Sequence, residues 1–245
     1  MSESSVKRTW YAAEGSRWAE LLTILHLPYT GMVLCYVGLG AFLAPVLHWD
    51  RLWWCLLAYF LGLGVGAHAL DELSGRPYGR SFTERELWVI GITTLLLASL
   101  IGVYYAVTLS PWLWLFILLG AFFAISYPLA HLFGGRFHTD FWFTLSWGGL
   151  PFLTSYFLQT LTLTLPALLM AGALAGTAAI EITLSRWVRA FRKRPARLHM
   201  VHTDGVEEEW EFGQLIGKPE RALKLLVVTV YLFTAAVGAW RFFDR

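Results

Sequence analysis

Ionisable side chains gather at the point where an apolar, glycine-spaced stretch of the sequence ends. Residues 61–80 contain His68 and, three, four and eight positions after it, Asp71, Glu72 and Arg76. If a helix continues through them, these spacings place all four side chains near one face. Ionisable groups at a helix end close to hydrocarbon are candidates for function.

The two acids of this stretch suit a divalent cation. Mg²⁺ prefers hard oxygen ligands and often bridges a carboxylate to a phosphate, so Asp71 and Glu72 are candidate ligands. Arg76 and Arg80 suit phosphate oxygens, which a guanidinium group binds as a fork. The same charges also fit a solvated helix end in which Glu72 and Arg76 form an ion pair one turn apart.

A third acid, Glu181, stands inside an apolar segment, five residues before the basic Arg186. An acid surrounded by apolar residues is costly unless it is paired, coordinated or protonated, or unless it reaches the membrane interface. The basic cluster at 189–197 fits an orientation signal that contacts anionic lipid, and phosphate binding is the alternative. The acidic residues at 204–211 are typical of a charged surface segment exposed to water, and we do not expect them to be ligands.

The apolar run that ends at Ser126 is followed by Tyr127, Pro128 and a short polar stretch with Arg136 and Asp140. Tyr127 fits an interfacial anchor. It also fits the wall of an aromatic pocket, because an aromatic face stabilises a developing allylic cation.

The elements that must position these residues are membrane helices. Of the 245 residues, 57% are hydrophobic and 15% are charged, and the mean hydropathy is +0.55. Soluble domains carry nearer a quarter charged residues. The apolar runs are continuous and long enough to cross a bilayer, which predicts an all-α, polytopic membrane protein. Cys35 and Cys55 both lie in apolar segments and indicate neither a disulfide framework nor a zinc site. We expect no nucleic-acid partner.

The apolar runs predict about seven transmembrane helices in a single integral membrane domain, residues 1–245. Pro28 is expected to kink the first helix or to mark its start. Thr83 and Glu86 predict a capping box, Ser110 predicts a cap, and Pro151 predicts a break. A lead-in at 1–18 and a polar loop at 186–220 flank these helices. The predicted spans are 19–47, 52–70, 86–109, 111–128, 141–161, 166–187 and 222–243.

The charge distribution orients the seven predicted spans. With the N-terminus in the cytoplasm, 16 of the 19 basic residues lie in cytoplasmic segments, and Arg51, Arg241 and Arg245 lie outside. This asymmetry follows the positive-inside rule. We therefore expect a multi-pass protein of the cell membrane whose N-terminus, lead-in and 186–220 loop are cytoplasmic.

The segment at 126–169 resembles the middle of the UbiA superfamily of intramembrane prenyltransferases. That superfamily typically shows a Tyr and Pro at a helix end, a short basic loop, and an acid that opens a glycine-rich helix with a Pro, a Tyr and Gln-Thr. The matching residues here are Tyr127, Pro128, Arg136, Asp140, Gly148, Gly149, Pro151, Tyr156, Gln159 and Thr160.

The family's two acidic motifs can be aligned with this chain in the same way. His68 takes the position of the usual Asn, Glu72 that of the first Asp and Arg76 that of the second, with Asp71 available by a one-residue shift. Glu181 matches the second acidic signature. The family generally has nine helices, whereas seven are predicted here.

The resemblance implies a UbiA-like bundle around a central apolar cavity. The expected function is Mg²⁺-dependent transfer of a prenyl chain from a prenyl diphosphate to an aromatic or lipid acceptor. The alternative is a catalytically degraded UbiA-like subunit or lipid-binding protein. In that case a second copy or a partner subunit covers the side of the bundle where the family's two further helices are missing. In the first case Asp71, Glu72 and Glu181 hold Mg²⁺ and, with Asp140, form the catalytic set. The expected substrate-binding residues are His68, Arg76, Arg80, Tyr127, Arg136 and Tyr156.

Overall fold

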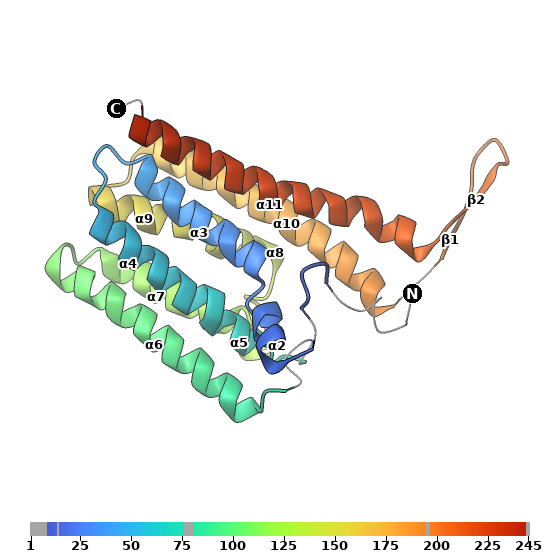
Figure 1. Ribbon diagram of the computed structural model, residues 1–245, viewed down its shortest axis with the longest axis horizontal. Helices are drawn as coiled ribbons and strands as arrows, with labels where there is room; N and C mark the ends of the chain where they lie inside the picture. Colours follow the sequence, from blue (N-terminus) through green and yellow to red (C-terminus); the bar gives the residue numbers. More distant parts are fainter. Residues whose placement is uncertain (1–8, 14, 76–80, 195–196, 244–245) are drawn as a thin grey trace.

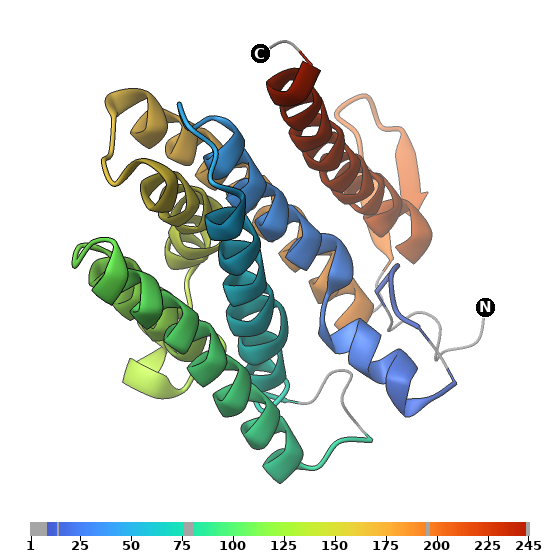
Figure 2. The same cartoon turned by 60° about the vertical axis from the view of Figure 1, so that its left-hand side comes forward.

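The chain folds into a bundle of long helices with a small hairpin beside it (Figure 1). The computed structural model describes residues 9–13, 15–75, 81–194 and 197–243. The long helices run roughly side by side, and the short α2 lies at an angle to them (Figure 1). Figure 2 shows α4 between α3 and α6, in the middle of the molecule.

The first predicted helix is two helices. α2 (Arg17–Ile24) and α3 (Leu27–Phe42) are bent by 44° relative to each other. Pro28 lies in the first turn of α3, where its missing N–H has no helical partner to lose. Pro28 therefore marks the start of a helix. His26, between the two helices, takes a left-handed conformation with φ of 45°.

The next helical segment, which we call the second leg, is continuous, but its backbone hydrogen-bond pattern changes from α-helical to π-helical and back. α4 (Trp49–Tyr59) passes into the π-helix η1 (Phe60–Ala67) and then into the short α5 (His68–Asp71). Glu72 caps the end of α5. The glycine-spaced stretch of the sequence therefore forms the wide turns, and the ionisable residues follow in the last turn of the leg.

The next two helices form a pair. α6 (Glu84–Thr108) begins with the predicted capping box, in which Thr83 and Glu86 bond each other's backbone N–H groups. α7 (Leu113–Ser126) begins later than predicted, and Trp112 takes the N-cap position. The predicted cap at Ser110 is wrong, because its backbone carbonyl, and not its hydroxyl, accepts from Leu113 at 3.1 Å.

The fifth leg also contains a π-helix. After the 3₁₀ turn η2 (Leu132–Gly135), α8 (Asp140–Phe143), η3 (Thr144–Gly149) and α9 (Leu150–Thr160) run on without interruption. The break predicted at Pro151 is wrong. Pro151 sits in the first turn of α9, directly after the wide turns of η3, where the hydrogen-bond register already changes.

The polar segment predicted at 186–220 is mostly structured. α10 (Leu165–Lys193) continues through the first basic residues, because Arg and Lys are good helix formers and suit a helix C-terminus. β1 (Leu198–Val201) and β2 (Glu207–Trp210) form an antiparallel hairpin. α11 (Phe212–Phe243) then begins ten residues before the predicted span and includes Pro219. The lead-in is likewise shorter than predicted, since α2 begins at Arg17.

Within the described residues, four helices are long and apolar enough to cross a membrane, and a fifth span results if the bent α2–α3 pair is counted. This supports a helical membrane protein. It does not reach the seven predicted spans: α7 has only 14 residues, and the α8–η3–α9 leg is not among the candidates. The four candidates are Trp49–Asp71, Glu84–Thr108, Leu165–Lys193 and Phe212–Phe243.

Two glycines allow the helices to approach closely. A Cβ at Gly148 would lie 2.7 Å from the Ala175 Cα, so η3 rests directly on α10. A Cβ at Gly40 would lie 2.5 Å from the Phe152 carbonyl oxygen, so α3 rests directly on α9. Small residues at helix contacts are typical of membrane bundles, where backbones pack against each other.

Candidate functional site

Most of the described ionisable residues predicted from the sequence lie at one end of the bundle, where α8 packs against α10 and where α5 and α7 end. We call this the polar end. Its residues are His68, Asp71, Glu72, Tyr127, His138, Asp140, Glu181, Arg186 and Arg189.

Two of these side chains are buried in the last turn of the second leg. His68 is 8% exposed and Glu72 is 1% exposed. The His68 ring nitrogen Nδ1 lies 3.1 Å from the Gly64 carbonyl oxygen in η1. The His26 ring packs edge-on against the His68 ring, with centroids 4.6 Å apart. The short α5 therefore turns its polar face inward, against the α2–α3 bend.

Glu181 is the buried acid of α10. It is 7% exposed, and among the described residues its carboxylate has neither a hydrogen bond nor an ion pair. The charge that acts on it is Arg189, two turns further along α10. The charge of Arg189 also affects Asp71 and Tyr127, so this exposed guanidinium group is near enough to influence three of the predicted site residues electrostatically.

Tyr127 forms the aromatic wall of the polar end. Its ring stacks on His138 with centroids 4.6 Å apart, and lies 5.4 Å from Phe143 and 5.1 Å from Trp147. Its hydroxyl faces the Arg186 guanidinium group. Tyr127 is only 8% exposed, so it is a wall residue packed inside the bundle.

The cation beside Tyr127 also has an acidic partner. Arg186 Nε lies 2.8 Å from Asp140 Oδ1, and this ion pair joins the first turn of α8 to α10. Thr139 caps α8 and thereby holds Asp140 in that first turn. The structure thus gives Asp140 a basic partner. Arg136 lies on the exposed loop before α8.

The remaining predicted site residues are not brought to the polar end. Tyr156 lies in the last turns of α9, where its hydroxyl is 3.2 Å from Thr164 Oγ1. One turn further, Gln159 bonds the backbone of His48 at the start of α4, so Tyr156 is at the opposite end of the bundle. Arg76 and Arg80 lie outside the described residues.

The expected magnesium ligands do not form a set. Among the described residues, no group of three or more His, Cys, Asp or Glu side chains converges as metal ligands do. Mg²⁺ requires near-octahedral oxygen coordination at short distances. Asp71, Glu72 and Glu181 therefore do not fit a shared magnesium site in this arrangement, although all three lie at the polar end.

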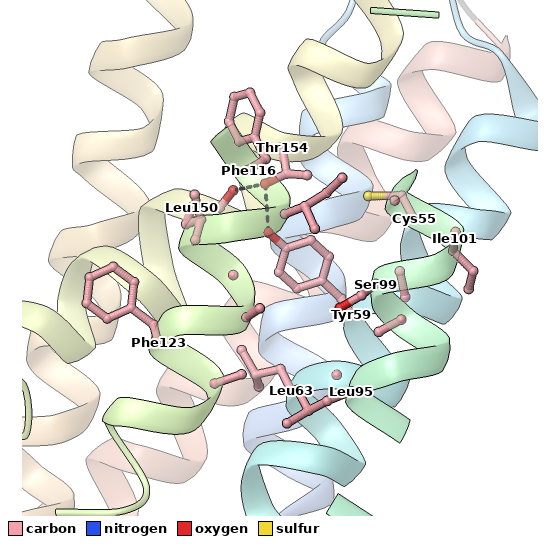
Figure 3. Close-up of a pocket in the computed structure, with 18 of the residues that line it drawn as sticks. Cys55, Tyr59, Leu63, Leu95, Ser99, Ile101, Phe116, Phe123, Leu150 and Thr154 are labelled. Atoms are coloured by element: carbon pink, nitrogen blue, oxygen red, sulfur yellow. Dashed lines mark hydrogen bonds between the residues drawn. The ribbon is translucent and has the colours of Figure 1, made fainter. Parts of the chain in front are cut away.

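An apolar cavity, whose lining residues were not identified from the sequence, lies beside the polar end. It has a volume of about 130 Å³ and is bounded by α4, η1, α6, α7, η3 and α9 (Figure 3). Its lining contains no charged residue. The Tyr59 hydroxyl and Thr154 Oγ1 are 2.7 Å apart, and Thr154 donates to the Leu150 carbonyl at 2.8 Å. These polar groups are satisfied within the protein, so the cavity presents an apolar interior.

One aromatic layer separates this cavity from the charges. Trp147 lines the cavity and also contacts Tyr127, whose hydroxyl faces Arg186. Leu63 likewise lines the cavity and packs in the same hydrophobic cluster as Tyr127. An amphipathic molecule with an apolar chain and a polar head matches this succession of environments.

Two features of the site had signals in the sequence that were not used. His26 is a polar residue two positions before a proline within an apolar run, which is typical of a helix break that exposes a side chain. The small residues Ala98 on α6, and Gly120 and Ala121 on α7, line the cavity between these two helices. Small residues at such positions also allow two helices to pack closely, so only the folded structure shows whether they form a cavity or a tight contact.

Comparisons with protein-family models, with curated proteins and with solved structures found no match to this chain. The similarity to the UbiA superfamily noted in the sequence therefore stays a prediction.

Proposed function

We propose that this chain is a UbiA-like membrane protein that binds a prenyl diphosphate. The observation that carries the proposal is the succession of an apolar cavity, an aromatic layer and the polar end with its two arginines within one bundle. The cavity accepts the hydrocarbon chain, and Trp147 and Tyr127 form the layer where the chain meets its head group.

The cations of the polar end would hold the diphosphate. Arg186 faces Tyr127, Arg189 acts on Asp71 and Glu181, and Lys193 acts on Asp71. Guanidinium groups bind phosphate oxygens through paired hydrogen bonds. Of the cations expected from the sequence, Arg136 is on the neighbouring loop, and Arg76 and Arg80 follow the end of α5.

The membrane arrangement belongs to the same proposal. In it, all seven helical legs cross the bilayer around the cavity, including the short α7 and the α8–η3–α9 leg. The polar end faces the cytoplasm, as the distribution of basic residues predicts. The chain then sits in the cell membrane with its N-terminus inside.

Prenyl transfer to an aromatic or lipid acceptor is the catalytic form of the proposal. The faces of Tyr127 and Trp147 would stabilise positive charge on the allylic carbon. The apolar cavity would keep water from that carbon. Arg186 and Arg189 would offset the charge that develops on the leaving diphosphate. Because the described acids do not form a magnesium site, no step is assigned to a metal.

A second candidate is a lipid-binding subunit without transferase activity. Two observations favour it: the predicted magnesium ligands do not converge within the described residues, and Asp140 already neutralises Arg186. In this form the protein binds the prenyl lipid and presents it to a partner subunit or to a second copy.

Binding and turnover measurements separate the two candidates. The purified chain in lipid nanodiscs is given a labelled prenyl diphosphate, with and without Mg²⁺, and the Arg189→Gln variant is compared with Arg197→Gln. Both arginines are exposed, but Arg197 is on the hairpin, paired with Glu209. Binding that Arg189→Gln weakens and Arg197→Gln preserves supports the proposal.

Transfer to an aromatic or lipid acceptor, in addition to binding, selects the enzyme. Binding without turnover, together with co-purification of a stoichiometric partner, selects the subunit. No binding of the prenyl diphosphate under either condition overturns both candidates.

A further inference from the structure

α7 ends closer to the middle of the bundle than the helical leg beside it. The Phe116 ring packs on the Phe157 ring with centroids 5.2 Å apart, so these two residues lie at the same level. From Phe116, α7 continues for ten residues to Ser126, which is about 15 Å of helix. From Phe157, the fifth leg extends back over seventeen residues to Asp140, which is about 25 Å. α7 therefore stops about 10 Å short of the level where α8 begins.

The segment at 127–139, which we call the α7–α8 loop, occupies this layer. The side of α7 that leads to it is exposed and apolar, and includes Leu118 and, one turn later, Phe122. The Phe122 ring contacts the rings of Phe133 and Phe137 in the loop, with centroids 5.9 and 4.8 Å apart. The apolar outer surface of α7 thus continues onto the loop.

The tip of the α7–α8 loop is an aromatic ring on an unfavourable backbone. Phe133 has φ of 54° and ψ of 28°, in the left-handed region that a residue with a Cβ seldom adopts. Gly134 and Gly135 follow in the same region. The protein buries little of the Phe133 side chain, since this residue remains 63% exposed. Surrounding hydrocarbon would bury the rest of the ring and thereby offset the backbone strain.

The backbone of the α7–α8 loop suits a place without water. Irregular backbone is tolerated at membrane depth only where its polar groups find partners in the protein. The Tyr127 carbonyl accepts from His138 Nδ1 at 2.6 Å. The Pro128 carbonyl accepts from the Ser74 hydroxyl at 2.9 Å. Six backbone N–H groups of the loop donate to carbonyl groups of the loop or of α7, namely those of Tyr127, Leu129, Ala130, Leu132, Arg136 and His138.

From these observations we propose that the α7–α8 loop lies in the cytoplasmic leaflet of the bilayer and completes the span of the short α7, with Phe133 in the hydrocarbon. The exposed Arg136, three residues later, then lies at the level of the lipid phosphates, which attract guanidinium groups. Its partner is thus a lipid phosphate instead of the diphosphate expected from the sequence. This inference rests on the membrane arrangement of the proposed function, in which α7 crosses the bilayer.

Spin labels measure the depth of the loop with the protein in lipid nanodiscs. Cys35 and Cys55 are replaced by alanine, and one labelled cysteine is introduced at a time. The three labelled positions are Leu118, Phe133 and Val201, which are 64%, 63% and 63% exposed. Leu118 lies within α7, and Val201 lies on the hairpin outside the bundle. Collisions with oxygen, which concentrates in hydrocarbon, are compared with collisions with a water-soluble nickel chelate.

Leu118→Cys is expected to collide mainly with oxygen and Val201→Cys mainly with nickel. Phe133→Cys is expected to resemble Leu118→Cys. If Phe133→Cys instead resembles Val201→Cys while Leu118→Cys reports hydrocarbon, this inference is overturned and the proposed membrane arrangement stands. If Leu118→Cys itself reports water, the proposed arrangement fails and this inference fails with it.

A second measurement needs neither labels nor changes at the native cysteines. Phe133→Leu and Phe133→Asn both lose the ring contacts with Phe122 and Phe137. Asn adopts the left-handed conformation more readily than Leu, so in water Phe133→Asn should melt at least as high as Phe133→Leu. In hydrocarbon the Asn amide loses its water, so Phe133→Leu should melt higher in nanodiscs by about 2–4 °C. Equal melting temperatures, or the opposite order, overturn the inference.

Discussion

Asp140 Oδ1 and Arg186 Nε lie 2.8 Å apart, and this ion pair joins the first turn of α8 to α10 beside the Tyr127 hydroxyl. The two side chains are 50% and 44% exposed. Exposed ion pairs contribute between zero and about 1 kcal/mol, because water screens them. The pair therefore serves to position the Arg186 cation at the aromatic layer more than to hold the fold.

Opposite effects on ligand binding are expected from the two halves of this pair. Asp140→Asn releases Arg186 from its counter-charge, so affinity for a prenyl diphosphate should rise a few-fold, while Arg186→Gln should lower it about tenfold. Thermal melting of both variants should stay close to that of the native chain. Equal losses of affinity in both variants would show that the pair matters only as a unit.

Replacing the buried acid of α10 should stabilise the protein. Glu181 is 7% exposed and lacks an ion pair among the described residues, so its burial has an uncompensated desolvation cost. Glu181→Gln replaces the buried ionisable carboxyl by a neutral amide of the same shape, and the free energy of unfolding should increase by about 1 kcal/mol. Thermal melting in detergent provides the measurement.

Glu220→Gln is the matched comparison. Glu220 Oε2 lies 2.9 Å from Arg192 Nη2, and the two side chains are only 13% and 11% exposed. Removing one partner of a largely buried ion pair is destabilising by about 3 kcal/mol, so this variant should melt lower than the native chain. Destabilisation by Glu181→Gln of the same size would mean that Glu181 has a partner of comparable strength.

Close helix packing at η3 predicts intolerance of any side chain at one glycine. In Gly148→Ala the new Cβ would lie 2.7 Å from Ala175 Cα and 2.8 Å from the Leu174 carbonyl oxygen, and both are backbone atoms that cannot turn aside. The melting temperature should drop, with a loss of about 2 kcal/mol. Gly176→Ala on the open face of α10 has nothing within 4 Å and should gain about 0.5–1 kcal/mol.

A polar clamp at the opposite end of the bundle should be important for stability. Gln159 accepts from the His48 N–H at 2.7 Å and donates to the His48 carbonyl at 3.2 Å, which ties α9 to the start of α4. Gln159→Leu leaves both backbone groups without this partner, and a loss of about 2–4 kcal/mol is expected. Thr162→Val on the adjacent exposed loop is the control and should melt like the native chain. Similar melting of both variants would contradict the clamp.

The helical legs were largely predictable, because long apolar runs and local caps are encoded within a few residues of each other. The capping box of Thr83 and Glu86 and the helix start at Pro28 are of this kind. The register changes at 60–67 and 144–149 were not predicted. A π-helix has the same apolar composition as an α-helix, and only packing of its neighbours favours the wider turn.

The candidate site was predictable in its residue types but not in its arrangement. Asp71, Tyr127 and Arg189 are separated by more than fifty residues along the chain, so tertiary packing alone brings them together. Conversely, Tyr156 carries the motif seen in the sequence yet lies near Thr164 at the opposite end. The cavity had no charged signature, because its lining is mostly small and apolar, with hydroxyl groups such as that of Thr154.

The π-helix η1 lies immediately before the acidic pair, and this has a consequence for tracing ancestry. A π-turn closes with an extra residue compared with an α-turn, so it behaves as a concealed insertion. A protein with the same fold but a regular helix at 60–67 would have one residue fewer, and its first acid would align with Glu72 or with Asp71 depending on where the gap is placed. Aligning the two sequences without a gap in this segment would therefore pair the wrong acidic residue.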